Sequence, residues 1–301
     1  MTLFRSRPRL LLALVAIVAA GLLVARLLSG GHDTTVRASV DPHAIPHYSP
    51  GELHRLLAAT DAASTATSQA ALVSRGRALF NDPSVARTGE ACGSCHTIGT
   101  TNPNVGTILH NENGRVFGRD PISLIGVSRT PPYLWTGAVP TLQQQIINTI
   151  KTFFVNGPTQ SDATTAAQAA ALIAYLDQLR PPTTSFDQGT MSAVALRGEV
   201  LFQGKGGCIA CHGGPLFTDN KLHDTLVPNR PGWDDPGATV PPGAFNTPTL
   251  RDVRNSAPYM HNGVFKTLRD VIDFYNTRSS IAPLGLTPQE EDDLVAYMEA
   301  L

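Results

Sequence analysis

The chain has 301 residues, a hydrophobic content of 42% and a formal net charge of −1. This length suits two modest domains, and the near-zero charge offers neither a basic surface for nucleic acid nor a charged surface for an anionic membrane. We therefore expect no nucleic-acid partner, and the function has to be inferred from motifs.

The first 30 residues differ in kind from the rest. Arg5, Arg7 and Arg9 precede an uncharged apolar run over residues 10–25. A basic flank before such a run is typical of an export signal or a signal anchor, and we favour an uncleaved anchor because no small-x-small cleavage site follows. The positive-inside bias keeps the basic end in the cytoplasm. The rest of the chain is then expected in the periplasm, tethered to the inner membrane only through residues 1–30.

Residues 31–70 are rich in Ala, Ser, Thr and Pro. Such a composition predicts a polar linker with one short helix. Its histidines are interpreted as solvated side chains: His32, His43, His47 and His54.

All four cysteines of the chain lie in two strings, Cys92-Gly-Ser-Cys95-His96 and Cys208-Ile-Ala-Cys211-His212. Two thiols one helical turn apart can bond to the two vinyl groups of one porphyrin, and the next histidine can supply the proximal nitrogen to iron. Each string therefore predicts a covalently bound c-type haem, with His96 and His212 as iron ligands.

Three other arrangements of paired cysteines stay open but fit less well. A four-cysteine zinc site usually draws on pairs that are close in sequence, whereas Cys95 and Cys208 are 113 residues apart. A thioredoxin-like pair needs a strand-to-helix setting, which the glycine-rich flanks of the second string do not supply. Disulfides would leave both following histidines unexplained.

The chain after residue 70 is an internal duplication. Arg75–Phe80 ahead of the first string matches Arg197–Phe202 ahead of the second, and similar apolar helices around Tyr175 and Tyr297 close the two halves. The fold class is therefore mainly α, with two cytochrome-c-like helical domains, each wrapped on one covalently bound c-type haem. The predicted domains are residues 71–182 and residues 183–301.

The segment between each string and its closing helix aligns without gaps. Residues 132–137 match residues 258–263, an offset of 126 residues. His261 then replaces Trp135, which makes the second pocket more polar than the first. At the same offset Tyr275 faces Thr149, and tyrosine can ligate ferric haem iron whereas threonine ordinarily does not.

Over residues 70–301 these motifs resemble the bacterial diheme cytochrome c peroxidase and MauG family. The resemblance rests on the paired haem strings, the Arg-Gly-x-x-Leu-Phe openers, and Asn246–Arg251 leading into Ala257–Phe265. It implies that the first haem reacts with hydrogen peroxide and that the second is a six-coordinate electron relay. Peroxidase members ligate the second iron with methionine and MauG-like members with tyrosine, and Tyr275 resembles the MauG version.

Other residues compete for places around the second haem. Met260 and His261 are the competing ligands to its iron. His261 is otherwise expected to hydrogen-bond near the iron or a propionate, and His223 is expected to make a structural contact.

The resemblance also identifies the candidate catalytic residues of the first site. The family places a glutamate just after the Trp-x-Gly turn, where this chain has Gln143, and glutamine cannot shuttle a proton between peroxide oxygens. His110 resembles the loop histidine with which peroxidase members close the first haem. His110 or Glu112 are alternatives for the proton carrier, and a surface histidine without a role is equally open.

A calcium ion between the two domains is a further implication of the resemblance. The family holds it through an asparagine side chain and the backbone carbonyls of a Thr-x-Pro region. Asn246 and Pro248 match that region, and Asn111 or Asn113 are further sources of the side chain. Oxygen ligands of this kind suit a hard cation.

The leading prediction is a periplasmic diheme c-type oxidoreductase that uses hydrogen peroxide as oxidant and passes electrons from the second haem to the first. Its partners would be hydrogen peroxide and either a small periplasmic electron donor or a protein that it oxidises. Two alternatives stay open. One is a non-catalytic diheme electron-transfer cytochrome with both irons six-coordinate, which Gln143 favours. The other is a haem-based gas sensor.

Overall fold

A computed structural model describes residues 48–301 except residues 88, 97–106, 111–115, 232–234, 236 and 238–239, with the backbone alone for residues 107–110, 116 and 117. The described residues belong to one compact unit. None of the described helices is both long and apolar enough to cross a membrane. The expected signal or anchor at residues 1–30 lies outside the described residues.

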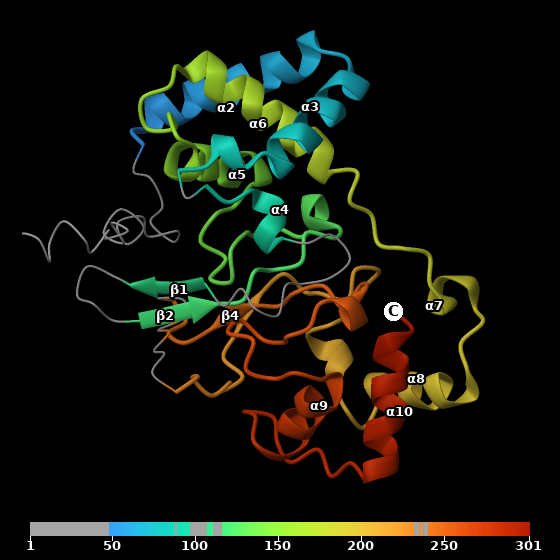
Figure 1. Ribbon diagram of the computed structural model, residues 1–301. Coiled ribbons are helices and arrows are strands. Elements are labelled where there is room, and N and C mark those ends of the chain that lie inside the picture. Colours follow the sequence, from blue (N-terminus) through green and yellow to red (C-terminus); the bar gives the residue numbers. More distant parts are fainter. Residues whose placement is uncertain are drawn as a thin grey trace, which may run out of the picture. The chain divides into compact units, whose positions relative to one another are not determined.

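The fold is mainly helical, as predicted (Figure 1). The helices of the first half are α2 (Pro50–Ala66), α3 (Gln69–Asn81), α4 (Cys92–Cys95), α5 (Leu142–Phe153) and α6 (Asp162–Leu176). The helices of the second half are α7 (Ser185–Gln188), α8 (Ala193–Gln203), α9 (Leu268–Thr277) and α10 (Pro288–Glu299). The described residues also form two short antiparallel two-stranded sheets. One pairs β1 (Thr107–His110) with β2 (Val116–Arg119), and the other pairs β3 (Leu222–His223) with β4 (Phe245–Asn246).

Both halves contain the same helix crossing, which the glycine of the Arg-Gly-x-x-Leu-Phe motif makes possible. In the first half α3 packs on α6 at Gly76, where a Cβ would lie 2.0 Å from the Ala171 carbonyl oxygen. In the second half α8 packs on α10 at Gly198, where a Cβ would lie 1.9 Å from the Asp293 carbonyl oxygen. A larger residue would force the two backbones apart, so the motif glycines set the same crossing twice.

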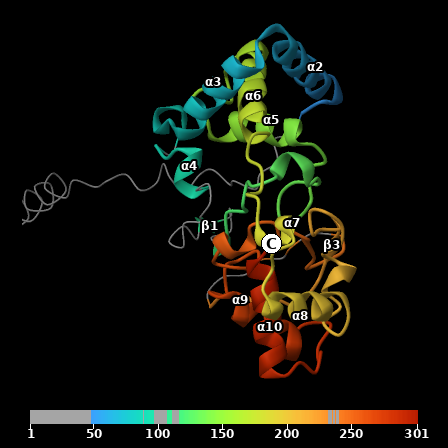
Figure 2. The ribbon, with the colours of Figure 1, turned by 90° about the vertical axis from the view of Figure 1, so that its right-hand side faces the viewer.

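An aromatic pair lies beside each crossing. The ring centroids of Phe80 and Tyr175 are 5.3 Å apart, and those of Phe202 and Tyr297 are 5.2 Å apart. The first pair belongs to an apolar core drawn from the first half of the chain, and the second pair belongs to a core drawn from the second half. Figures 1 and 2 show α2, α3 and α6 at one end of the unit and α8, α9 and α10 at the other.

The segments that align without gaps adopt the same backbone turn in both halves. Tyr133 N donates to Val139 O at 2.7 Å, and Tyr259 N donates to Phe265 O at 2.8 Å. The predicted internal repeat is therefore confirmed in the backbone.

The helix after each turn begins at a matched threonine. The Thr141 hydroxyl accepts a hydrogen bond from Gln144 N at 3.2 Å, and the Thr267 hydroxyl accepts one from Asp270 N at 3.1 Å. Each contact caps the first turn of its helix. Helices α5 and α9 therefore start in register, and the 126-residue offset holds along them.

Helix α2 lies inside the segment that the composition indicates to be a linker with one short helix. It has 17 residues and begins after a Ser49 cap. Leu56 and Thr60 are fully buried, and α2 packs against α5 and α6. The few leucines of α2 lie on one face of the helix, among many alanines and threonines. The average composition of the segment therefore does not reveal that this face is buried. The core of the first half therefore starts before residue 71.

The halves meet through a reciprocal pair of backbone hydrogen bonds. Asp120 N donates to His261 O, and Asn246 N donates to Trp135 O, each at 2.7 Å. The offset of 126 relates Asp120 to Asn246 and Trp135 to His261. Each half therefore contributes the same two repeat positions to the junction, as in an isologous contact between two identical subunits.

Candidate haem and peroxide site

Each cysteine string forms one short helical turn that ends at its histidine. The first is α4, and the second is η4 (Cys208–Ala210) with the residues that follow it. In both strings the histidine backbone N donates to the carbonyl of the first cysteine, at 2.9 Å in the first and 2.8 Å in the second. The two thiols and the imidazole therefore follow one another along a single turn, as porphyrin attachment requires.

Both imidazole rings are oriented by backbone carbonyls. His96 Nδ1 donates to Ile122 O at 3.0 Å, and His212 Nδ1 donates to Phe217 O at 2.9 Å. The Pro248 carbonyl also hydrogen-bonds His212, and Pro248 is the counterpart of Ile122 at the 126-residue offset. Because Nδ1 holds the proton, Nε2 keeps a lone pair that is available to ligate iron.

Burial supports the same protonation state. It lowers the pKa of His96 and of His212 below the ordinary value, because a charged ring would be poorly solvated there. Both rings therefore fit the role of proximal haem ligand.

A cavity of about 340 Å³ adjoins the second string. It is lined by Cys208, Cys211 and His212, by Tyr275 of α9, and by residues between 120 and 135 of the first half. Its volume and mostly apolar lining are typical of a site for a large organic cofactor. The cavity thus fits the second haem and extends to the junction between the halves.

Tyr275 is brought into this cavity by α9. Its side chain lies close enough to Cys208 and Cys211 for their charges to act on it, and it hydrogen-bonds Thr225. Burial raises the pKa of Tyr275 to about 12. The phenol therefore keeps its proton unless a metal cation stabilises the phenolate. Ligation of iron by Tyr275 stays a prediction, and its position fits that role.

Helix α5 carries different side chains on the corresponding face. The α9 residues that line the cavity are Leu268, Val271, Ile272 and Tyr275. Their counterparts on α5 are Leu142, Gln145, Ile146 and Thr149. Thr149 donates its hydroxyl proton to Gln145 O at 2.9 Å, within its own helix. At the position of Tyr275, the first half therefore has a short side chain.

Gln143 lies on another side of α5. Its Nε2 donates to Leu57 O and to the Asp61 carboxylate of α2, both at 3.0 Å. Its counterpart in α9, Arg269, likewise avoids the cavity and pairs with two carboxylates of α10. The structure does not bring Gln143 to the α5 face that corresponds to the cavity lining.

His110 falls in β1, opposite Val116 of β2. Its side chain lies outside the described residues, and so do Asn111, Glu112 and Asn113. Their suggested roles at the first iron and at calcium stay predictions.

His261 is buried at the junction of the halves. Its ring stacks on Phe245 with 3.5 Å between centroids and 8° between planes, and its Nε2 has no hydrogen-bond partner among the described residues. Burial lowers the pKa of His261 to about 4, although the Asp235 carboxylate acts in the opposite direction. His261 also lines the cavity. A neutral ring with a free buried nitrogen fits the expected polar contact to the cofactor.

Asp235 also anchors the junction itself. It accepts two hydrogen bonds from Arg119 of β2, at 2.7 and 2.8 Å, and both side chains are buried. Such a bidentate pair fixes geometry as well as charge. No sequence pattern indicated this pair, because its members are far apart in the chain and match no motif.

Asn246 reaches across the junction with its side chain. Its Nδ2 donates to Pro132 O at 2.9 Å, while its Oδ1 is buried without a partner among the described residues. A buried amide oxygen without a partner fits a ligand to a hard cation.

Asp120 is a residue that sequence reasoning missed. It is buried and lines the cavity, and burial raises the pKa of its carboxyl to about 7, with Lys266 and Arg230 opposing this rise. A nearby cation would favour the charged carboxylate. Asp120 is the counterpart of Asn246 in the repeat, so applying the 126-residue offset backwards would have found it.

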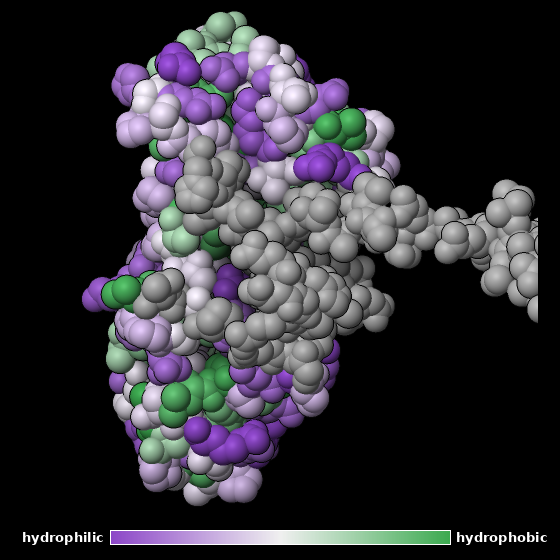
Figure 3. All heavy atoms as spheres, turned by 90° about the vertical axis from the view of Figure 1, so that its left-hand side faces the viewer, coloured by the Kyte–Doolittle hydropathy of each residue, from purple (hydrophilic) through white to green (hydrophobic). Residues whose placement is uncertain are grey.

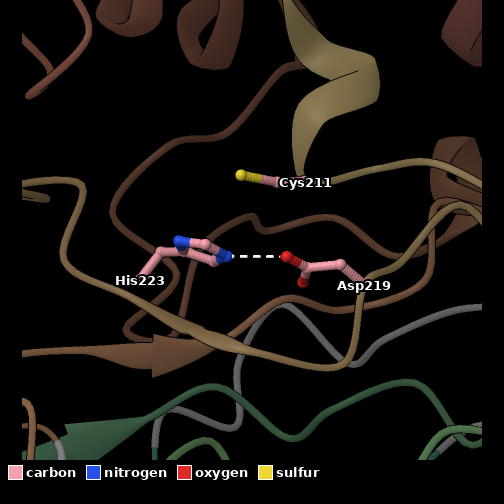
Figure 4. Close-up of side chains that lie close together, drawn as sticks. All are labelled: Cys211, Asp219 and His223. Carbon is pink, nitrogen blue, oxygen red and sulfur yellow. Dashed lines mark hydrogen bonds and ion pairs between the residues drawn. The ribbon is translucent and has the colours of Figure 1, made fainter.

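A further group of side chains lies beside the second string. Figure 4 shows Cys211, Asp219 and His223, whose candidate ligand atoms all lie within 4.8 Å of one another. His223 Nε2 and the Asp219 carboxylate are 2.8 Å apart. Since haem attachment would use the Cys211 sulfur, we interpret the group as an Asp219–His223 contact at the edge of the haem site.

Two matched helical halves, each with a cysteine pair and an oriented histidine, define the class of duplicated helical proteins that attach two c-type haems. The comparisons with known proteins agree with this class. The family described as di-haem cytochrome c peroxidase (CCP_MauG) matches residues 70–180. Methylamine utilization protein MauG of Methylorubrum extorquens is 30% identical over 282 residues, which cover 76% of this chain and 77% of that protein.

Other relatives and solved structures agree. Cytochrome-c peroxidase IdrP1 of Denitromonas iodatirespirans is 29% identical over 303 residues, which cover 76% of this chain and 81% of the relative. The diheme peroxidase BthA of Burkholderia thailandensis superposes with a TM-score of 0.60 at 21% identity, over 77% of this chain and 86% of BthA. A MauG-like protein associated with microbial copper homeostasis gives a TM-score of 0.61 at 24% identity, over 76% of this chain and 88% of that chain.

The chain belongs to the diheme cytochrome c peroxidase and MauG family. It is a diheme peroxidase-type oxidoreductase, and its cofactors are haem c.

Proposed function

We propose that this protein uses hydrogen peroxide as oxidant at the first site and passes electrons to that site from the second, in the periplasm. When bound, haem supplies an iron that exchanges single electrons and takes oxygen ligands. Cys92, Cys95 and His96 would hold the first haem, and Cys208, Cys211 and His212 the second. Tyr275 would supply a further ligand to the second haem.

The observation that carries the proposal is the contrast between Thr149 and Tyr275. Helices α5 and α9 are in register, and both proximal histidines are oriented by a carbonyl at the matched position. Tyr275 enters the second cavity, while Thr149 bonds to its own helix. Helix α5 would then supply no ligand to the first haem, which would leave that haem accessible to peroxide, whereas Tyr275 would supply a ligand to the second.

The rival function is a non-catalytic electron-transfer cytochrome with both irons six-coordinate. Gln143 is the residue that favours it, since a carboxamide cannot move the proton that peroxide cleavage needs. The Gln143 side chain also hydrogen-bonds to α2, so it is not directed to the α5 face where a proton carrier would be needed. His110 would close the first iron in this alternative.

We further propose that a calcium ion lies at the junction between domains 71–182 and 183–301. The unpartnered Asn246 Oδ1 and the buried Asp120 carboxyl supply the oxygen donors that suit such an ion. The Pro248 carbonyl, expected as a further ligand, hydrogen-bonds His212.

The proposed partner is a small periplasmic electron donor or a protein that the enzyme oxidises. Figure 3 shows a hydrophobic patch on the lower half of one face, surrounded by hydrophilic side chains. Apart from Val155, the exposed large apolar side chains among the described residues all belong to the second half. They are Val194, Leu196, Val200, Ile209, Leu226, Val240 and Ile281. An exposed hydrophobic patch favours protein contact, so we place the partner on the second half.

The test is hydrogen peroxide consumption by the haem-loaded protein supplied with a reduced donor. The proposal expects steady turnover, with two electrons taken up per peroxide. Tyr275→Phe should change the low-spin spectrum of the second haem, whereas Tyr297→Phe, a buried tyrosine on α10 outside the cavity lining, should not. Absence of turnover in a protein whose haems are both loaded would support the electron-transfer alternative.

A further inference from the structure

We propose that the Thr225 hydroxyl donates a hydrogen bond to the phenol oxygen of Tyr275 when that oxygen ligates the second iron, and that this bond raises the reduction potential of the second haem. The inference deepens the proposed function and rests on the ligation by Tyr275 proposed there. Thr225 is then a positioning residue of the electron-relay site, because it acts through the ligand and touches neither peroxide nor the iron.

The first step is the placement of the two side chains. Thr225 and Tyr275 both line the cavity beside the second cysteine string, and Thr225 hydrogen-bonds the Tyr275 side chain. The oxygen of a ligating tyrosine has lost its proton and can only accept, so the threonine hydroxyl has to be the donor. Threonine ordinarily does not ligate haem iron. Thr225 can therefore contact the ligand atom without competing for the metal.

The second step is how the segment that carries Thr225 is held against the end of α9. Ser280 donates its backbone N–H to Thr225 O at 3.4 Å and its hydroxyl to Asp224 O at 3.0 Å. Ser279 donates its hydroxyl to Tyr275 O at 3.2 Å. Two adjacent serines thus connect the ligand residue and its hydrogen-bond donor to the same piece of backbone.

The third step is a strained residue next to Thr225. Leu226 has a φ of 60°, in the left-handed region that bulky side chains rarely adopt. Its side chain is 58% exposed, so burial of the leucine does not offset the strain. Leu226 N donates to the Asp224 carboxylate at 2.9 Å, which holds the turn. Strain of this kind persists where the surrounding structure fixes it, commonly at functional sites, and here the turn carries a hydroxyl that lines the cavity.

The fourth step is that the serine support belongs to the second half alone at these repeat positions. At the 126-residue offset Ser279 and Ser280 correspond to Phe153 and Phe154. Phe154 is buried in the apolar core of the first half. The two hydroxyl groups therefore occur in the half that has a tyrosine at the ligand position, and the matched positions of the other half carry aromatic rings.

The chemistry of the ligand sets the direction of the effect. A phenolate gives electron density to iron and favours the ferric state, and a hydrogen bond donated to its oxygen withdraws part of that density. Thr225 would thereby make the second haem easier to reduce. An electron relay requires this property, because it has to be reduced by a donor before it can pass an electron on.

The test is a spectroelectrochemical titration of the haem-loaded protein that measures the midpoint potential of each haem. Thr225→Val keeps the shape of the side chain and removes the hydroxyl. At a fixed potential it should shift the ratio of oxidised to reduced second haem about tenfold towards the oxidised form, a fall in midpoint of about 59 mV, and leave the first haem unchanged. Thr225→Ser should restore most of the loss. Thr277→Val is the matched control, since it removes an exposed α9 hydroxyl that bonds to Asp273 O, and it should not move either midpoint.

A Tyr275→Phe background separates this inference from the function on which it rests. There Thr225→Val should leave the second midpoint unchanged, because no phenolate remains to accept the bond. If Tyr275→Phe alters the low-spin spectrum but Thr225→Val lowers the midpoint equally in both backgrounds, or in neither, the Thr225 assignment alone is overturned. If Tyr275→Phe leaves the low-spin spectrum unchanged, Tyr275 is not a ligand, and the proposed ligation fails together with the inference.

Discussion

The two halves of this chain share a scaffold and differ where a haem would meet the protein. Each half has a glycine helix crossing, a turn closed by the same backbone bonds, and an imidazole oriented by a carbonyl. On the helix that faces the cofactor, Tyr275 in one half corresponds to Thr149 in the other. The comparison teaches that a duplicated fold can keep the same histidine geometry in both halves while different side chains occupy the matched face of the following helix.

The largest expected effect comes from making the first half like the second. Thr149→Tyr gives α5 the side chain that α9 presents to its cavity, and we expect it to close the first iron. A ligand that favours the closed state by about 3 kcal/mol leaves roughly one molecule in a hundred open, so peroxide turnover should fall about 100-fold. Thr152→Tyr, at the position of the exposed Arg278, is the control. Unchanged turnover in a folded Thr149→Tyr protein would contradict the matched register.

The shared crossings provide the second test. Gly76→Ala and Gly198→Ala each place a Cβ about 2 Å from a carbonyl oxygen of the facing helix. We expect each to lower the free energy of unfolding by about 3 kcal/mol, measured by urea denaturation of the haem-loaded protein.

Gly51→Ala in α2 is the matched control, since its Cβ would meet only the Arg55 side chain at 3.9 Å. It should be neutral or slightly stabilising. A large effect in one half alone would show that the two crossings are not equivalent.

The junction residues should differ in their response to pH. Burial lowers the pKa of His261 to about 4, while its counterpart Trp135 does not titrate. Because the unfolded chain binds the proton more readily, stability is retained above pH 6.5 and falls as the pH drops towards 4, by at most about 3 kcal/mol.

His261→Phe keeps the stacking on Phe245 and removes the titration. Thermal unfolding midpoints of the variant should therefore vary less between pH 7 and pH 4.5 than those of the unaltered protein. An equal decline in both proteins would show that other groups control the acid response.

The smallest expected effect concerns the junction's oxygen donors. Asn246→Leu removes the bond to Pro132 O and the free Oδ1, and should cost about 1 kcal/mol. A calcium chelator should lower the unfolding midpoint of the unaltered protein and leave that of the variant unchanged. The exposed Asn81→Leu should behave like the unaltered protein. A chelator effect of equal size in all three would place the ion elsewhere.

The repeat could be predicted because short sequence motifs encode it. The Arg-Gly-x-x-Leu-Phe openers, the turn around Trp135 and the closing helix around Tyr175 each depend on residues close in sequence, and the structure confirms these elements. The placement of Tyr275 in the second cavity followed from the same alignment.

What the sequence did not indicate depends on contacts between distant segments. The packing of α2 decides where Gln143 points, and no local pattern reports that Asp61 lies beside it. The junction pair of Arg119 with Asp235 joins residues from different halves. Asp120 was detectable only through its match to Asn246 at the 126-residue offset.

The most direct test of the central claim is low-temperature electron paramagnetic resonance of the haem-loaded protein, fully oxidised and after one-electron reduction. If Tyr275 closes the second iron while Thr149 leaves the first free, the spectra should contain one low-spin and one high-spin signal, or a high-spin signal that appears on half-reduction. Two low-spin haems in both states would mean that both irons are closed, and would contradict the assignment of an open first site.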